Sequence, residues 1–241
     1  MKGILLRVGI DKSAGHMNAP FDPESGQFVY LPIPERHPFK DGLEVRYDQF
    51  EEPLRALSER AELRKSTELP SHLKGAGCHL DPDFSHLTYG DQGNRGRIIK
   101  KLEKGDFIAF FASLRPLRSC RESLCYGLIG IFTVDRVCRV RDMPMQDFHR
   151  NAHTRRLSPN PKDIIVFGDP KSSGRFDRCI PIGARRNAAY RVTEECLDSW
   201  GGLEVKDGYI QRSVNPPFFT QPRTFREWLD CQAPTLRHSN N

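Results

Sequence analysis

The chain has 241 residues and a mass of 27.6 kDa, which predicts one or two compact lobes. Hydrophobic residues make up 37% of it, and its 15 Phe, 6 Tyr and 2 Trp supply enough apolar surface for a core, so wholesale disorder is excluded. The net charge of +6 permits a nucleic-acid partner without requiring one.

Three features favour a cytoplasmic protein without a membrane partner. The longest apolar stretches, 107–114 and 127–134, are far shorter than the ~20 residues that cross a bilayer. The first apolar run stops at Arg7 and Asp11 follows, so no signal-peptide core is predicted. The 7 cysteines include no Cys-x-x-Cys and suit reduced thiols better than disulfides or a zinc ribbon.

Apolar periodicity and breaker residues predict a mixture of strands and helices. In chain order we predict a strand over 3–10, an edge strand over 28–34, a helix over 48–65, a stretch without periodicity over 66–97, a short helix over 98–102, strands over 107–112 and 126–134, a basic helical segment over 143–156, strands over 163–167 and 179–182, and a helix over 224–231. The last seven residues are expected to fray.

The strands over 107–112 and 126–134 are almost continuously apolar, which is typical of the centre of a closed or doubly covered sheet. We therefore expect a single α+β domain over 1–241, with a mixed, barrel-like central sheet and peripheral helices. A subdivision into a strand, helix and loop region over 1–97 and a core with the C-terminal helix over 98–235 is the alternative.

The densest run of chemically active side chains lies in the stretch without periodicity. It consists of Cys78, His79, Asp81, Asp83, His86, Tyr89 and Asp91. Histidines and carboxylates at such spacing suit a divalent metal, or an acid set beside a base. The spacing matches no zinc motif, and an Asp-Pro turn with Asx-type bonds also explains two of the aspartates. We expect a polar site without a metal, with a metal site and a plain loop as alternatives.

Two further loops are candidates for function. Lys171, Ser172 and Arg175 follow a buried strand, where backbone amides and these side chains could bind phosphate, although an ordinary β-turn is the alternative. The loop lacks the Gly-Lys-Ser/Thr ending of a Walker motif. Asp11 ends the first strand beside Lys12, where it is either a general base or metal ligand, or the cap of a turn.

Arginines gather in two segments, over 135–156 and over 175–191. Arginine suits bidentate phosphate contacts and stacking on bases, so we expect at least one of the two segments to bind phosphate, with a solvated surface as the alternative. No Gly-x-Gly-x-x-Gly follows a predicted strand, which argues against a dinucleotide cofactor. The sequence leaves the cofactor unknown.

Four segments together resemble the nucleotide-modification-associated domain family, third type. They are Leu5-Leu6-Arg7-Val8-Gly9-Ile10-Asp11-Lys12, Tyr30-Leu31-Pro32-Ile33-Pro34-Glu35, the stretch from Asp81-Pro82-Asp83-Phe84 to Leu87-Thr88-Tyr89-Gly90-Asp91, and Phe167-Gly168-Asp169-Pro170. The resemblance spans nearly the whole chain and implies a role in DNA base modification, in the setting of phage or bacterial defence.

A second, local resemblance concerns 105–111 and 126–132, which are similar to the core strand pair of the PUA-like superfamily with its ASCH and EVE domains. That resemblance implies a small β-barrel that grips RNA or modified DNA bases. It covers only the predicted central strands.

Taken together, these patterns favour a nucleic-acid-directed protein that modifies or recognises a base. The pocket is expected to contain Asp11, Asp81, Asp83, His86, Tyr89 and Asp91, and phosphate is expected to meet Lys12, Lys171, Ser172, Arg175, Arg155 and Arg156. DNA is the expected partner, with RNA or a nucleotide as alternatives, and protein partners are unknown. The alternative functions are a non-catalytic reader of modified bases through a PUA-like pocket, and an enzyme on free nucleotides.

Overall fold

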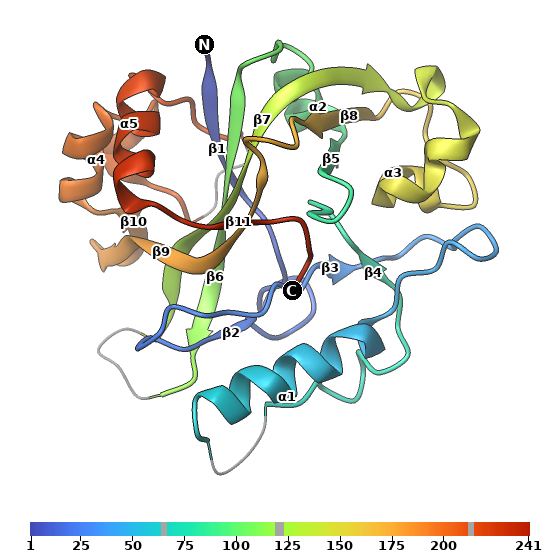
Figure 1. Ribbon diagram of the computed structural model, residues 1–241, viewed down its shortest axis with the longest axis horizontal. Coiled ribbons are helices and arrows are strands. Elements are labelled where there is room, and N and C mark those ends of the chain that lie inside the picture. The colour runs from blue at the N-terminus through green and yellow to red at the C-terminus, as the bar shows by residue number, and fades with distance from the viewer. Residues whose placement is uncertain (64–66, 119–122, 212–214) are drawn as a thin grey trace.

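A large mixed sheet forms the centre of the molecule in a computed structural model that describes residues 1–63, 67–118, 123–211 and 215–241 (Figure 1). Over these residues the sheet has nine strands: β1 (Gly3–Arg7), β2 (Pro20–Phe21), β5 (Thr88–Asp91), β6 (Phe107–Pro116), β7 (Cys125–Arg139), β8 (Ile164–Gly168), β9 (Gly174–Arg186), β10 (Ala189–Val192) and β11 (Leu236–Arg237). A separate two-stranded ladder joins β3 (Ile33–Pro34) to β4 (Cys78–His79).

The long strand β7 organises the sheet. Its first part lies between β6 and β9, and its last part pairs with β8, which in turn pairs with β5, all antiparallel. The strands β1 and β2 run parallel to β6 along its other edge. The expected α+β class with a mixed sheet is confirmed.

The barrel-like closure is not found among the described strands. A barrel would require the outer edge of β1 to meet the opposite edge of the sheet. That edge is instead covered by a loop: Leu5 N donates to Pro217 O at 2.9 Å, and Phe219 N donates to Gly3 O at 2.9 Å. A covered edge needs no further strand, and the sheet stays open.

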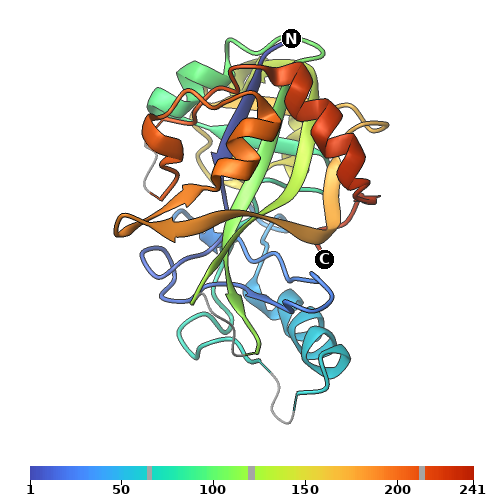
Figure 2. The same cartoon turned by 90° about the vertical axis from the view of Figure 1, so that its left-hand side faces the viewer.

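Both faces of the sheet are buried, as the continuous apolar runs predict. Along β6, Ile108 and Phe110 pack into one core, whereas Phe107 and Phe111 pack into the other. Two helices, α4 (Glu194–Trp200) and α5 (Pro222–Gln232), cover the second face and lie in front of the sheet in Figure 2. The first face is covered by the segments between β2 and β5, including α1 (Glu51–Arg60).

The predicted helices are shorter or displaced. The helix expected over 48–65 is a 3₁₀ turn, Tyr47–Phe50, followed by α1, and its last expected residues lie outside the described ones. The segment 143–156 is a 3₁₀ turn, Met145–Arg150, and then α3 (Ala152–Arg155), because Asn151 between them is extended. Two further short 3₁₀ turns are Val140–Asp142 and Lys206–Gly208.

The other two predicted helices begin earlier than expected, and the edge strand is shorter. The helix α2 (Gly93–Ile99) largely precedes the expected 98–102. Pro222 at the first turn starts α5 two residues before 224. Of the strand expected over 28–34, only β3 forms. None of the described helices has the length and apolar character needed to span a bilayer.

The expectation that the last residues fray is wrong. The strand β11 pairs with β9, and the two asparagines that follow it are anchored by their side chains. The Asn240 side chain accepts from Phe84 N at 2.8 Å and donates to Asp83 Oδ1 at 3.1 Å. Asn241 accepts from Tyr30 N at 2.7 Å and donates to Tyr30 O at 3.0 Å. These amides satisfy backbone groups of the core, which apolar periodicity does not reveal.

Candidate functional site

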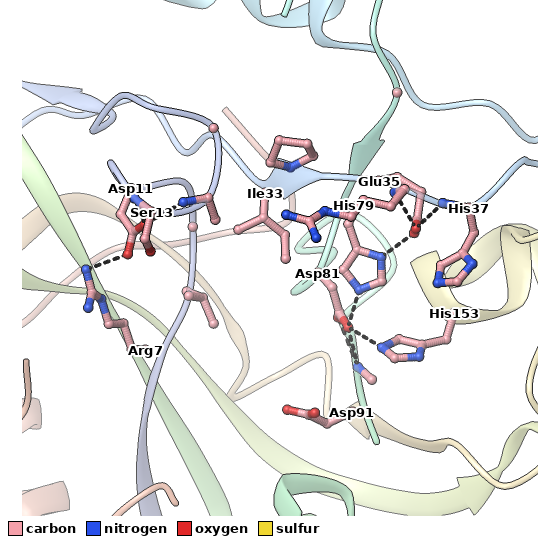
Figure 3. Close-up of a pocket in the computed structure, with 18 of the residues that line it drawn as sticks. Arg7, Asp11, Ser13, Ile33, Glu35, His37, His79, Asp81, Asp91 and His153 are labelled. Atoms are coloured by element: carbon pink, nitrogen blue, oxygen red, sulfur yellow. Dashed lines mark hydrogen bonds and ion pairs between the residues drawn. The ribbon is translucent and has the colours of Figure 1, made fainter. Parts of the chain in front are cut away.

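A cavity of about 870 Å³ lies among the loop after β1, the β3–β4 ladder, the β5–α2 turn and α3 (Figure 3). Its deepest side chains, including His79, Asp81 and His153, are buried. Its mouth carries exposed basic side chains such as Arg36 and Arg95. The cavity therefore combines a protected polar floor with a basic rim.

Two histidines converge on one carboxylate at the floor. His79 is on β4, Asp81 follows that strand, and His153 is on α3. Asp81 Oδ2 lies 3.8 Å from His79 Nε2 and 3.5 Å from His153 Nε2. One donor atom of each residue lies within 4.8 Å of the others, and Figure 3 shows both rings turned toward Asp81.

A second carboxylate orients each ring from behind. Glu35 Oε2 lies 2.6 Å from His79 Nδ1, and Asp163 Oδ2 lies 2.6 Å from His153 Nδ1. An ionised carboxylate only accepts hydrogen bonds, so each Nδ1 carries the proton and donates it. This arrangement fixes both rings and directs both Nε2 atoms at Asp81.

Asp81 itself is held by backbone. Gly90 N, on β5, donates to both carboxylate oxygens at 2.9 Å, and the Asn151 side chain donates to Oδ1 at 3.4 Å. A Cβ at Gly90 would lie 2.5 Å from the His153 ring and 2.8 Å from Asn151 Oδ1. Only glycine at this position therefore allows β5 to lie this close to His153 and Asn151.

Burial and hydrogen bonding shift the acidity of these groups. Burial favours the neutral ring of His153, but the hydrogen bonds with Asp163 and Asp81 outweigh it and raise its pKa to about 9. Burial also opposes ionisation of Glu35, yet the hydrogen bond from His79 lowers the pKa of this carboxyl to about 2. The floor thus stabilises positive charge between carboxylates, which suits proton transfer or cation binding.

A group of three interacting side chains lies beside this floor. The Tyr89 hydroxyl donates to Asp91 Oδ2, and Arg95 Nε lies 3.1 Å from the same oxygen. Burial raises the pKa of Asp91, and Arg95 acts against it. Tyr89 and Asp91, which both lie on β5, line the cavity, as predicted for the pocket.

Asp11 also lines the cavity but is occupied as a turn cap. Its Oδ1 accepts from Ser13 N at 2.7 Å and Ala14 N at 2.9 Å, while Arg7 lies 2.8 Å from Oδ2. Burial opposes the effect, but the Ser13 hydroxyl and Arg7 lower the pKa of Asp11. Lys12, next to it, is exposed and is not among the lining residues.

Asp83 and His86, although predicted for the pocket, do not line it. They form a separate cluster in which Asp83 Oδ2 lies 2.5 Å from Arg155 Nη2 and 2.9 Å from His86 Nδ1. Burial raises the pKa of Asp83, but His86 and Arg155 outweigh it and lower this pKa to about 2. Arg155, predicted to meet phosphate, is only 4% exposed, and its guanidinium group is directed into the protein, toward Asp83.

The loop predicted to bind phosphate lies outside the cavity as well. Lys171 N and the Ser172 hydroxyl donate to Asp169 Oδ1 at 2.9 and 3.2 Å, so the turn satisfies these donors itself. Arg175 is 8% exposed and donates to Ser239 O at 3.1 Å and Phe176 O at 3.0 Å. Of the residues predicted for phosphate, Arg156 alone is among the lining residues.

Sequence reasoning missed the residues that complete the floor. The sequence places His79 among the chemically active side chains but not in the predicted pocket, and His153 lies within the segment 143–156 that is predicted to be basic and helical. The pair His79-x-Asp81 is the only local hint. Glu35 and Asp163 lie in other segments, and no local pattern places them beside the histidines, because only folding brings them behind the two rings.

These features define the class: an α+β protein with an open mixed sheet and a buried histidine–carboxylate site below a basic rim. The chain belongs to the nucleotide modification associated domain 3 family, which matches residues 2–211 and so includes every residue that lines the cavity. The family resemblance drawn from sequence is confirmed, and it places the protein among those associated with nucleotide modification. No curated protein and no solved structure matches the chain, and no match supports the PUA-like resemblance.

Proposed function

We propose that this protein is an enzyme that admits one nucleotide unit of DNA to the cavity and modifies its base. The observation that carries the proposal is the buried His79, Asp81 and His153 cluster at the floor of a cavity with a basic rim. The volume of about 870 Å³ lies in the range of ligand sites, roughly 300–1,000 Å³, and accommodates a nucleotide.

The rim supplies groups for phosphate. Arg36 is exposed and, over the residues described, has no acidic partner within 4.0 Å. Arg95 pairs with Asp91 but its side chain is 44% exposed, which leaves guanidinium donors for an incoming oxygen. Guanidinium groups suit bidentate phosphate contacts, so both residues are placed to orient a nucleotide with its base toward the floor.

The floor supplies acid and base groups to the base. An imidazole and a carboxylate in a buried site suit general acid–base chemistry. A base in a duplex must leave the stack before such groups reach it, and the depth of the histidine cluster fits an extruded base rather than a paired one.

A second candidate is an enzyme on a free nucleotide. The arginines of the segment 135–156 are largely engaged within the protein: Arg136 stacks 3.6 Å from the Phe167 ring centroid, and Arg155 and Arg156 pair with Asp83 and Glu35. Fewer of them are therefore free to follow a DNA backbone than the composition suggests. This engagement favours a smaller substrate.

The test measures binding of a DNA duplex and of free nucleotides at two salt concentrations, followed by mass spectrometry of the recovered nucleosides. DNA action predicts affinity that falls with added salt, by nearly one power of the salt concentration per phosphate contact, together with a new nucleoside mass. Weak salt dependence with a modified mononucleotide would support the second candidate. Binding without a mass change would mean a reader.

A variant pair sharpens this test. Asp81→Asn should abolish the mass change while keeping nucleotide affinity within about threefold, because it alters the floor and not the rim. Asp169→Asn, in the loop outside the cavity, is the matched control and should behave as the natural chain. Failure of the natural chain to bind DNA or nucleotides at either salt concentration would overturn the proposal.

A further inference from the structure

We propose that His79, Asp81 and His153 bind a divalent transition-metal ion at the floor of the cavity. The inference goes beyond the proposed function, because it depends on the donor atoms and not on a nucleotide substrate. The spacing of these residues in the sequence predicts a polar site without a metal. The three-dimensional arrangement favours one.

The donor atoms are at the right separation. Metal–ligand distances of about 2.0–2.2 Å place neighbouring donors about 3–3.5 Å apart around an ion. Asp81 Oδ2 lies 3.5 Å from His153 Nε2 and 3.8 Å from His79 Nε2, and all three donor atoms lie within 4.8 Å of one another, so side-chain shifts of at most about 1.5 Å complete the set. Two imidazoles with one carboxylate suit Fe²⁺, Co²⁺ or Zn²⁺ better than Mg²⁺ or Ca²⁺.

The outer groups match those of a metal site. A histidine that binds a metal through Nε2 commonly donates Nδ1–H to a carboxylate, which fixes the ring and strengthens the ligand. Here both rings do so, His79 to Glu35 and His153 to Asp163, each at 2.6 Å. One such hydrogen bond can simply stabilise a buried histidine. Two rings that are both held in this way and both face one carboxylate match the arrangement of metal ligands.

The charge balance also calls for a cation. The side chains of Asp81, Glu35 and Asp163 are each at most 3% exposed. Arg156 contacts two of these carboxylates, with Nε 3.1 Å from Glu35 Oε2 and Nη1 4.0 Å from Asp163 Oδ2. An ion bound at the two Nε2 atoms takes the place of protons there, and with unprotonated Nε2 atoms the three carboxylates exceed the one guanidinium by two charges, which a divalent ion balances.

Three protein ligands leave further coordination positions. All three ligand residues line the cavity, so the remaining positions face the space proposed for the nucleotide. Such a site admits water or a substrate atom, unlike a structural site with four protein ligands.

The experiment uses the full chain without nucleotide, stripped of metals by chelation and titrated anaerobically with Fe²⁺, Co²⁺ or Zn²⁺. We expect one ion per chain, a visible Co²⁺ absorption band, and two paramagnetically shifted imidazole N–H signals in the NMR spectrum of the Co²⁺ form. The two signals report the Nδ1–H groups held by Glu35 and Asp163. Absence of stoichiometric binding, or a Co²⁺ form without these signals, would overturn the proposal even if every variant failed to fold.

Variants then assign the ligands. Asp81→Asn and His153→Gln should each weaken metal binding at least 100-fold, and Asp163→Asn about 10–100-fold. His86→Gln is the matched control, since it removes an imidazole that also contacts a buried aspartate, and should leave metal affinity unchanged. Binding lost in His72→Gln at the rim but retained in folded Asp81→Asn would also overturn the proposal. Because no nucleotide is present, these outcomes are independent of the proposed function.

Discussion

Two histidine–aspartate clusters lie side by side in sequence but serve different ends. At the cavity floor, Asp81 faces two imidazole Nε2 atoms and forms no ion pair with an arginine of the described part of the chain. Two residues later, Asp83 is paired with Arg155 and His86 and accepts from Ser85 N at 3.0 Å. A carboxylate saturated by a guanidinium and backbone donors holds the fold together, whereas one that faces imidazoles across a cavity can act on a ligand. Residue type alone does not separate the two.

The largest expected effect tests the structural cluster. Asp83→Ala leaves the Arg155 guanidinium buried without its partner, and breaking such a pair costs about 3–5 kcal/mol of unfolding free energy. Urea denaturation followed by circular dichroism measures it. Asp81→Asn keeps an acceptor for Gly90 N and should change the same free energy by under about 1 kcal/mol. Equal losses in both variants would break the comparison.

A smaller effect tests the backbone that supports the cavity cluster. Gly90→Ala places a methyl group 2.5 Å from the His153 ring, so the ring must leave its position facing Asp81 or the backbone of β5 must move. We expect a loss of about 1–3 kcal/mol in unfolding free energy, as in other overpacked cores. The same ring shift should reduce turnover or metal affinity at least tenfold. A variant that keeps full metal affinity would show that the close approach of β5 does not position His153.

The tail provides a third test of the structural cluster. Asn240→Ala removes hydrogen bonds with Phe84 N, Asp83 Oδ1 and the Ser85 hydroxyl. At about 0.5–1.5 kcal/mol for each bond, part of which water replaces, the unfolding free energy should fall by about 1–2 kcal/mol. Thermal denaturation measures the change, and activity per folded molecule should stay constant. Reduced activity without reduced stability would connect the tail to the cavity instead.

The smallest effect compares the rim with the loop predicted for phosphate. Arg36→Ala removes an exposed guanidinium from the cavity mouth and should weaken nucleotide binding about tenfold, or ~1.4 kcal/mol. Lys171→Ala removes a lysine from the loop after β8 and should leave affinity within about twofold. Isothermal titration with one nucleotide measures both. The reverse order of effects would move phosphate binding to the loop.

Sequence reasoning reached part of the candidate site. Asp81, Tyr89 and Asp91 are predicted for the pocket because they lie in a polar run that no helix or strand period explains. All three line the cavity. Asp83 and His86 belong to the same run and are turned to Arg155. A run of polar residues shows that a loop is unusual, but it does not show which side chains share a cavity.

The pattern of amino acids is enough to predict the central strands and the α+β class. The runs over 107–112 and 126–134 are almost continuously apolar, and both form strands of the buried sheet. They can be predicted because hydrophobic patterning is read from neighbouring residues alone. Motifs spread along the chain also indicate the family to which it belongs.

The open sheet and the anchored last residues are seen only in the folded chain, because both depend on backbone groups that meet across the fold. The same holds for the site. His79, Asp81 and His153, with Glu35 and Asp163 behind the rings, come from four separate segments of the chain. Their function depends on distances of a few ångströms that no local pattern encodes.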